Sequence, residues 1–199
     1  MPFSAGVFKK ETLEYIKNNF STSSKILDIG CGAGSYSDLL KPSGYSIDGI
    51  EGFEPYVDRF NLKLKYDNLY IVDSTKQPKE FFSKYDLIIM GDVFEHFSHI
   101  DALDILEKIG NIRTIIAVPY SGEQGAEFGN DFEIHRQTDL NPINFHSRFS
   151  GFFPYCVGYD YGVYINDPDL NFLYKEGHAQ ERWMNYVENN FVIDRQFTI

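Results

Sequence analysis

A short apolar segment that runs directly into a glycine-rich turn constrains this 199-residue chain most strongly. Residues 26–29 are apolar except for Asp28, and Gly30, Gly32 and Gly34 follow before a stretch with a helical pattern. Glycine adopts positive φ easily and lets a ligand approach the backbone closely. Because ligands of open α/β sheets bind at the carboxyl ends of the strands, we expect a binding site at this turn.

Strand-like and helix-like segments alternate through the first two thirds of the chain. Apolar runs predict strands at residues 25–29, 45–51, 69–73, 85–90 and 112–118, and amphipathic stretches predict helices at 36–41, 55–66 and 98–109, after a leading helix at 9–20. This alternation is typical of βαβ units around a parallel sheet. We expect one domain over residues 1–199, with the leading helix in 1–24, a cofactor-binding core in 25–119 and an acceptor-side loop with the final strands in 120–199.

The last third of the chain has a weaker pattern. Residues 120–150 lack clear periodicity and predict a long loop, and loops of this length are usually functional. Beyond them, the pattern predicts a strand at 155–165, a helix at 181–190 and a final strand at 191–197.

Polar side chains stand where the first three predicted strands end. Glu51 follows Gly30 by 21 residues, and a carboxylate at this offset can accept both ribose hydroxyls of a nucleoside. Asp73 and Ser74 end the third strand, where they could meet a base amino group. Asp28 is costly inside a strand unless it orders the turn or meets a cation. A dinucleotide motif requires glycine where Ser35 stands, which argues against a nicotinamide-dependent oxidoreductase.

The run Asp-Ile-Gly-Cys-Gly-Ala-Gly over residues 28–34 resembles the first motif of the class I S-adenosylmethionine-dependent methyltransferases. The resemblance covers about residues 25–119 and includes Glu51, Asp73, the run over 86–96 and Val-Pro-Tyr at 118–120. It implies an α/β, Rossmann-like sheet of seven mostly parallel strands with helices on both faces. The last strand, at 191–197, would be antiparallel. It also implies methyl transfer from S-adenosylmethionine, with S-adenosylhomocysteine as the product.

The resemblance also assigns cofactor contacts. This cofactor has a sulfonium, an amino-acid tail and no phosphate, so its site needs hydrogen-bond acceptors and not a basic cradle. Glu51 would hold the ribose, Asp73 and Ser74 would face the adenine, and the backbone of residues 30–34 would line the methionine part. The expected cofactor-binding set is Asp28, Gly30, Cys31, Gly32, Gly34, Glu51, Gly52, Asp73, Ser74 and Asp92. We expect Cys31 to be an apolar filler and not a nucleophile.

The exit of the fourth predicted strand carries the candidate catalytic residues. His96 is the best candidate base because the ordinary pKa of imidazole lies near neutrality, and Glu95 and His135 are further catalytic candidates. Asp92 and Glu95 also have the spacing of a helix-start capping box, which would not exclude a catalytic role.

A metal-assisted alternative uses the same residues. Asp92, Glu95 and His96 would share one face of a helical exit and, with His135, could bind a divalent cation. The small-RNA 2′-O-methyltransferases have a similar cluster, although Asp92 replaces their glutamate and His135 does not align cleanly with their later histidine. We keep a metal-assisted RNA 2′-O-methyltransferase as an alternative, whereas metal-free transfer is the first expectation.

The net charge limits the classes of molecule that this chain is expected to bind. The chain has 18 basic and 29 acidic residues, a formal net charge of -11, so it lacks the electrostatic footprint of most nucleic-acid-binding proteins and is repelled by anionic membranes. Two cysteines cannot form a disulfide framework, and no apolar run approaches the roughly 18 residues of a membrane helix. We expect a cytoplasmic monomer or homodimer that methylates a small metabolite or sugar. A non-catalytic cofactor-binding relative is a further alternative.

Overall fold

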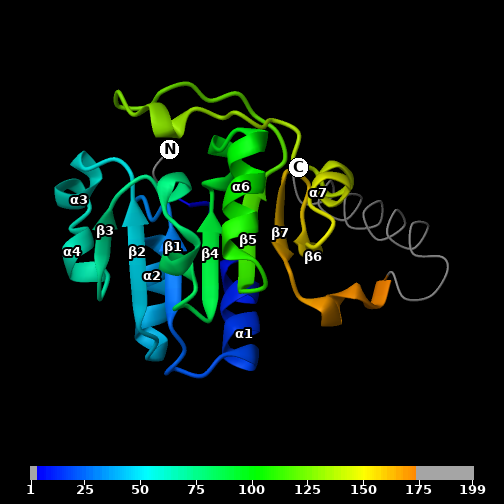
Figure 1. The fold of residues 1–199 in the computed structure, drawn as a ribbon, viewed down its shortest axis with the longest axis horizontal. Helices are drawn as coiled ribbons and strands as arrows, with labels where there is room; N and C mark the ends of the chain where they lie inside the picture. The colour runs from blue at the N-terminus through cyan, green and yellow to red at the C-terminus, as the bar shows by residue number, and fades with distance from the viewer. Residues whose placement is uncertain (1–3, 174–199) are drawn as a thin grey trace, which may run out of the picture.

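The computed structural model describes residues 4–173, and a seven-stranded sheet lies at its centre (Figure 1). The strands are β1 (Ile26–Ile29), β2 (Ile47–Glu51), β3 (Leu69–Ile71), β4 (Leu87–Gly91), β5 (Arg113–Pro119), β6 (Phe153–Val157) and β7 (Tyr161–Ile165). Their order is β3-β2-β1-β4-β5-β7-β6. Strands β1 to β5 run parallel, and β7 is antiparallel to both β5 and β6. The predicted fold class is therefore confirmed.

Short helices connect the strands. The α-helices are α1 (Lys9–Asn19), α2 (Ser35–Leu40), α3 (Pro55–Arg59), α4 (Leu62–Lys65), α5 (Lys79–Phe82), α6 (His99–Ile109) and α7 (Pro142–Arg148). The 3-10 helices are η1 (Lys41–Ser43), η2 (Ser74–Lys76), η3 (Phe94–His96), η4 (Asp131–Glu133) and η5 (Pro168–Leu173). Ser98 caps α6 by accepting a hydrogen bond from the Asp101 amide at 3.1 Å, so this predicted helix starts where its sequence signal lies.

Side chains cover both faces of the sheet. On one face, Ile88 and Met90 of β4 pack with Ile105 and Ile109 of α6, and on the other face Leu87 and Ile89 pack with residues of α1 and α2. Figure 1 shows α6 and α1 on opposite faces. Burial on both faces explains why the predicted strand at 85–90 lacks polar alternation. Strand β1 pairs with β2 on one side and β4 on the other, so the strand order reverses between β1 and β4.

The end of the sheet differs from the prediction. The single strand expected at 155–165 is a hairpin of β6 and β7, closed by a hydrogen bond of 2.8 Å from the Gly158 amide to the Tyr161 carbonyl. The ring of Phe8 packs 3.2 Å from the place where a Cβ of Gly158 would lie, so glycine fits this tight turn. The antiparallel member of the described sheet is β7. The helix predicted at 181–190 and the strand predicted at 191–197 lie outside the described residues.

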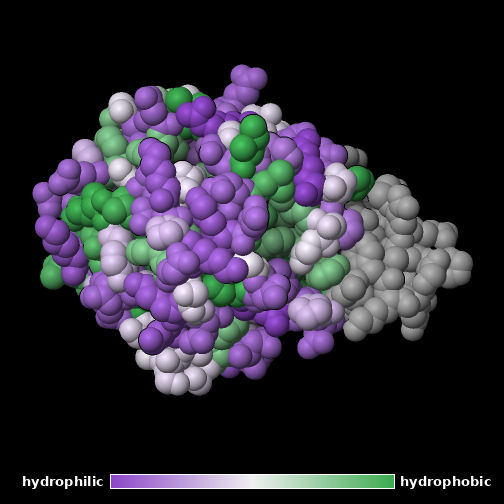
Figure 2. All heavy atoms as spheres, in the orientation of Figure 1, coloured by the Kyte–Doolittle hydropathy of each residue, from purple (hydrophilic) through white to green (hydrophobic). Residues whose placement is uncertain are grey.

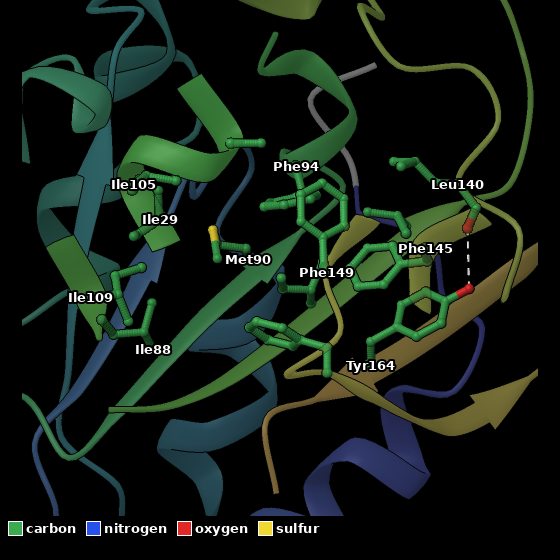
Figure 3. Close-up of a cluster of buried hydrophobic side chains, with 14 of the residues drawn as sticks. Ile29, Ile88, Met90, Phe94, Ile105, Ile109, Leu140, Phe145, Phe149 and Tyr164 are labelled. Carbon is green, nitrogen blue, oxygen red and sulfur yellow. Dashed lines mark hydrogen bonds between the residues drawn. The ribbon is translucent and has the colours of Figure 1, made fainter. Parts of the chain in front are cut away.

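Two further predictions need correction. The helix predicted at 55–66 is split into α3 and α4, because Asn61 takes a left-handed conformation (φ 53°), which asparagine tolerates better than most residues. The loop predicted at 120–150 contains η4 and α7, and Asn141 caps α7 through the Asn144 amide. Helix α7 is held by its Phe145 ring, which stacks on Tyr164 at a centroid distance of 3.8 Å, and Tyr164 donates a hydrogen bond to the Leu140 carbonyl (Figure 3).

The surface is mainly polar. Hydrophilic residues cover most of the face in Figure 2, with small hydrophobic areas between them. From residue 4 to residue 173, no helix combines the length and apolar character needed to cross a bilayer.

Candidate active site

A cleft of about 410 Å³ lies at the carboxyl ends of β1, β2 and β4, where the strand order reverses. The glycine turn after β1, the ends of β2 and β4, and the start of η2 line it, and residues 130–133 and 136 reach it from the segment that follows β5. Figure 1 shows that segment running across this edge of the sheet towards α3. The position agrees with the general place of ligands in open α/β sheets.

The glycine turn is fixed by close packing. Gly30 adopts φ 68°, and a Cβ at this position would lie 2.3 Å from a methyl group of Val93. The amides of Gly30 and Cys31 donate hydrogen bonds to the Ile50 carbonyl at 2.9 and 3.0 Å. The turn is therefore tied to β2 and packs against the exit of β4. Burial raises the pKa of the Cys31 thiol well above its usual range, which disfavours the thiolate that a nucleophile requires.

Glu51 holds the turn from the end of β2. Its side chain is buried, one carboxylate oxygen accepts a hydrogen bond from the Gly32 amide at 2.9 Å, and the other accepts from the Phe53 amide at 2.9 Å. Burial raises the pKa of Glu51, although these amides oppose the rise. Each carboxylate oxygen can accept more than one hydrogen bond, so Glu51 can hold the turn and still bind a ribose hydroxyl in the cleft.

Asp28 was expected either to order the amides of the turn or to meet a cation. Its carboxylate lies buried beneath the cleft and accepts a hydrogen bond of 2.6 Å from the Tyr66 hydroxyl, not from the amides of the turn. Burial raises the pKa of Asp28 to about 7, against the opposing effects of Tyr66 and the nearby Lys9. A cation placed beside this group would stabilise its charged form.

The cleft is also lined by three further residues of the predicted cofactor-binding set: Gly52, Asp73 and Ser74. Asp73 caps η2 by accepting hydrogen bonds from the Thr75 amide and hydroxyl. Although burial acts the other way, these bonds and the Lys76 ammonium hold the pKa of Asp73 below its usual value. Sequence reasoning missed Phe132, whose ring lies 3.3 Å from the place where a Cβ of Gly52 would be. This ring is half-exposed in the cleft, so it can stack on a flat ligand.

Asp92 ties three parts of the chain together. It has a left-handed backbone (φ 53°), and one of its carboxylate oxygens accepts hydrogen bonds from the Ser4 hydroxyl at 2.7 Å, the Ala5 amide at 2.8 Å and the Tyr161 hydroxyl at 2.8 Å. The capping box suggested for Asp92 is therefore wrong: η3 begins after Val93 and has no side-chain cap. The carboxylate is turned instead towards the N-terminal segment and β7.

Glu95, His96 and His135 lie together beside the cleft. Glu95 Oε1 is 4.0 Å from Nε2 of His96 and 4.0 Å from Nε2 of His135, and the centroids of the two imidazole rings are 4.9 Å apart. Their ligand atoms all lie within 4.8 Å of one another, the spacing of a possible metal site. Asp92 is not part of this group, so the four-residue metal set that the sequence suggested becomes a set of three.

Burial sets the charge of this cluster. It raises the pKa of the Glu95 carboxyl well above its usual range, with Asp92 adding to the effect, and it lowers the pKa of His96, with His135 adding to the effect. His135 Nδ1 is 2.8 Å from the Gly122 carbonyl, which only accepts hydrogen bonds. Nδ1 therefore carries a proton, and Nε2 is the ring nitrogen that faces Glu95.

The segment that brings His135 to the site is held by hydrogen bonds on both sides of this histidine. The Glu95 carbonyl accepts hydrogen bonds from the amides of Arg136 and Gln137 at 2.9 and 3.0 Å. Further along the cleft, the Tyr56 hydroxyl of α3 donates to Glu133 at 2.9 Å, and Gln124 donates to the other oxygen of Glu133 at 3.1 Å. These contacts explain how a segment far along the chain covers a site built by β1 to β4.

Comparisons with known proteins agree with this architecture. A family model described as a methyltransferase domain matches residues 7–116, more than half of the chain. The ubiquinone biosynthesis O-methyltransferase of Rickettsia prowazekii (strain Madrid E) is 30% identical over 105 residues, which are 51% of this chain and 41% of that protein. The chain thus spans about two fifths of the length of this curated relative.

Solved structures share the fold. Magnesium protoporphyrin IX methyltransferase from Synechocystis PCC 6803 with bound SAM has a TM-score of 0.57 and 16% identity, covering 79% of this chain and 76% of that one. An S-adenosylmethionine-dependent methyltransferase from Clostridium acetobutylicum ATCC 824 has a TM-score of 0.59 and 11% identity, covering 79% and 89%. The chain belongs to the methyltransferase-domain family, which confirms the family predicted from the glycine motif.

Proposed function

We propose that this domain transfers the methyl group of S-adenosylmethionine to a hydroxyl oxygen of a small-molecule acceptor. The observation that carries the proposal is a single cleft in which Glu51 and the glycine turn line one part and His96, with Glu95 and His135 behind it, lies at another. A nucleoside cofactor held by the first part would direct its methyl group towards the second. The similarity to an O-methyltransferase supports oxygen as the methylated atom.

Methyl transfer is an in-line displacement. A lone pair of the acceptor oxygen forms the new O–C bond while the C–S bond of the sulfonium breaks, S-adenosylhomocysteine leaves, and the hydroxyl proton must be taken up. An imidazole within reach of that oxygen can accept the proton, and His96 is the histidine that lines the cleft. His135 and Glu95 would orient it. Much of the rate would come from holding the two reactants in line within a cleft shielded from water.

A second candidate is the metal-assisted form of the same reaction, and a specific observation favours it. Glu95 and His96 each have a buried atom, Oε2 and Nδ1 respectively, that lacks a hydrogen-bond partner in the described part of the chain, so the hydrogen-bonding capacity of neither side chain is filled. A first-row divalent cation takes its ligands at about 2.1 Å, so it can join donor atoms up to about 4.2 Å apart. The two distances of 4.0 Å, from Glu95 Oε1 to Nε2 of His96 and to Nε2 of His135, fit this limit, whereas the whole set lies only within 4.8 Å.

In that form, Glu95, His96 and His135 would hold the cation, and the Gly122 carbonyl would orient the His135 ring through Nδ1. A bound divalent cation lowers the pKa of a coordinated hydroxyl. The cluster supports metal assistance only; it carries no information about RNA. The net charge of -11 favours a small acceptor over nucleic acid. We also propose that the protein is a cytoplasmic monomer or homodimer.

Calorimetric titration with S-adenosylhomocysteine and with NADH tests the proposal. We expect the wild type to bind S-adenosylhomocysteine and not NADH, Glu51→Ala to lose that binding, and Glu54→Ala, an exposed glutamate nearby, to keep it. Acceptor hydroxyls are then screened with and without chelator, which separates the two forms of the reaction. A folded wild type, free of carried-over product, that binds no S-adenosylhomocysteine would contradict the proposal, and binding of NADH would favour an oxidoreductase.

A further inference from the structure

Gln137 joins the two chain segments that carry His96 and His135. Its side-chain Nε2 donates hydrogen bonds to the carbonyls of Phe94 and Phe97, at 3.1 and 3.2 Å. Its backbone amide donates to the Glu95 carbonyl at 3.0 Å. These three carbonyls belong to η3 and to the residue after it. One residue of the segment after β5 therefore binds three carbonyls around the turn that holds two of the candidate catalytic side chains.

The turn η3 is a weak element by itself. It is a 3-10 helix of three residues without a side-chain cap, and 3-10 turns have poorer hydrogen-bond geometry than α-helices. Two backbone hydrogen bonds close it, from the His96 amide to the Val93 carbonyl at 3.0 Å and from the Phe97 amide to the Phe94 carbonyl at 3.3 Å. Gln137 adds three hydrogen bonds from outside the turn, so it restricts the orientation of η3.

The other side of this link leads directly to His135. A single residue, Arg136, separates Gln137 from this histidine, and the Arg136 amide also donates to the Glu95 carbonyl, at 2.9 Å. The two imidazole rings, whose centroids are 4.9 Å apart, thus lie on segments that Gln137 connects. A shift of Gln137 would move the rings relative to each other and to the Glu95 carboxyl.

The burial of Gln137 indicates that the link serves orientation more than stability. The side chain is buried, and its Oε1 has no hydrogen-bond partner in the described part of the chain. Because carbonyl oxygens only accept hydrogen bonds, Nε2 must face η3, which leaves Oε1 unpaired. The cost of burying an unpaired polar atom is similar to the gain from two neutral hydrogen bonds. The side-chain amide therefore adds little net stability, and what it adds is a fixed direction.

We infer that Gln137 is a positioning residue of the reaction, because it fixes η3 to the segment of His135 and so sets the arrangement of Glu95, His96 and His135. The inference rests on the proposed function and holds for both of its forms, since a general base and a bound cation both require these side chains at fixed places. Gln137 is not among the described residues that line the cleft, so it acts through its neighbours.

The test compares Gln137→Met with Asn166→Leu. Gln137→Met keeps the approximate size of the side chain and removes its two hydrogen bonds to η3. Asn166→Leu, the matched control, also removes two side-chain hydrogen bonds with the backbone, to the Ile112 carbonyl and from the Thr114 amide. These lie at the start of β5, at the opposite edge of the sheet from the cleft.

The first readout is the rate on an acceptor hydroxyl found in the screen described above. We expect Gln137→Met to lower kcat by about tenfold to a hundredfold, as for a small misplacement of reacting groups. The Kd of S-adenosylhomocysteine should stay the same, because Gln137 touches nothing in the glycine turn. Asn166→Leu should change neither value.

The second readout needs no acceptor and is not moved by a loss of stability alone. With their centroids 4.9 Å apart, the rings of His96 and His135 should give a nuclear Overhauser signal in the wild type and in Asn166→Leu. We expect this signal to be lost or strongly weakened in Gln137→Met.

A folded Gln137→Met variant that keeps either the wild-type kcat or the full ring-to-ring signal would overturn the inference, and so would an equal loss of kcat in Asn166→Leu. If Gln137→Met does not fold, Gln137→Asn, whose amide is one methylene shorter, is measured with the same expected direction and the same contrary outcomes. A wild type that binds no S-adenosylhomocysteine would refute the proposed function, whereas wild-type binding with an unchanged Gln137 variant refutes the inference alone.

Discussion

The two ends of the cleft are built in different ways. At the cofactor end, Glu51 at the end of β2 binds the Gly32 amide in the turn after β1, so this contact joins consecutive βα units and is fixed by a backbone amide. At the acceptor end, Glu95 meets His135 across a long stretch of chain, and the Tyr56–Glu133 hydrogen bond joins the segment that carries His135 to α3. The cofactor end is thus a local motif supported by a parallel sheet, whereas the acceptor end is assembled by the fold. We expect the first to set affinity for the cofactor and the second to set the rate and the acceptor.

The strongest test of this difference between the two ends removes an imidazole side chain from the acceptor end. His135→Ala removes one imidazole from the Glu95 cluster but touches nothing in the glycine turn. We expect kcat to fall by about a hundredfold or more, as for the loss of a catalytic acid–base or metal-ligand group, while the Kd of S-adenosylhomocysteine stays the same. His99→Ala, at an exposed histidine, should alter neither value. Parallel losses of kcat and cofactor affinity would show that the two ends are not separable.

The next largest effect concerns the cofactor end. In Gly30→Ala the new methyl group would meet Val93 at 2.3 Å in a left-handed backbone. We expect a loss of about 2–3 kcal/mol in the free energy of unfolding, from strain and overpacking, together with weaker S-adenosylhomocysteine binding. Gly125→Ala, in the segment after β5, has open space and should be close to neutral. Urea unfolding and calorimetry measure both effects, and an undisturbed Gly30→Ala would show that the turn is not rigid.

The pH dependence of stability tests the cofactor end alone, through the buried carboxylate of Asp28. The pKa of Asp28 rises from 3.8 to about 7 on folding, mainly through burial. Between these values the folded chain holds a proton that the unfolded chain has lost, so this contribution to stability is full below about pH 4 and disappears as the pH rises to about 7. Asp28→Asn stays neutral, so we expect its stability relative to wild type to increase over this range. Asp58→Asn, at an exposed aspartate, is the control, and a constant difference for Asp28→Asn would contradict the assignment.

The same contrast explains what could be predicted from the sequence. The alternation of strands and helices up to β5, the glycine turn and Glu51 follow from local patterns, because the motif and its offset belong to consecutive βαβ units. The ring of Phe132 over Gly52 could not be predicted, because nothing in the run around residue 132 specifies which strand end it reaches. The capping reading of Asp92 failed for the same reason: its hydrogen-bond partners, Ser4 and Tyr161, are distant in sequence and compete with the local cap.

Breaks in the regular backbone are the second kind of feature that could not be predicted from the sequence. The break at Asn61 and the turn at Gly158 depend on single residues inside segments whose apolar pattern is otherwise continuous. A pattern of apolar residues shows which positions on either side of a break are buried, but it does not mark the break itself, where Asn61 and Tyr159 are exposed. The chain therefore shows its core positions more clearly than the places where one element ends and the next begins.

The smallest expected effect tests the fastening between the two ends. Tyr56→Phe removes the hydrogen bond to Glu133 and keeps the ring. We expect a loss of about 0.5–1.5 kcal/mol in the free energy of unfolding, with faster proteolysis within residues 121–138 and a higher KM for the acceptor. Tyr45→Phe removes a comparable hydrogen bond to the Phe20 carbonyl away from the cleft, so it controls for stability alone. If both variants lose stability but only Tyr56→Phe opens the segment, Tyr56 is the contact through which the locally built end positions the end assembled by the fold.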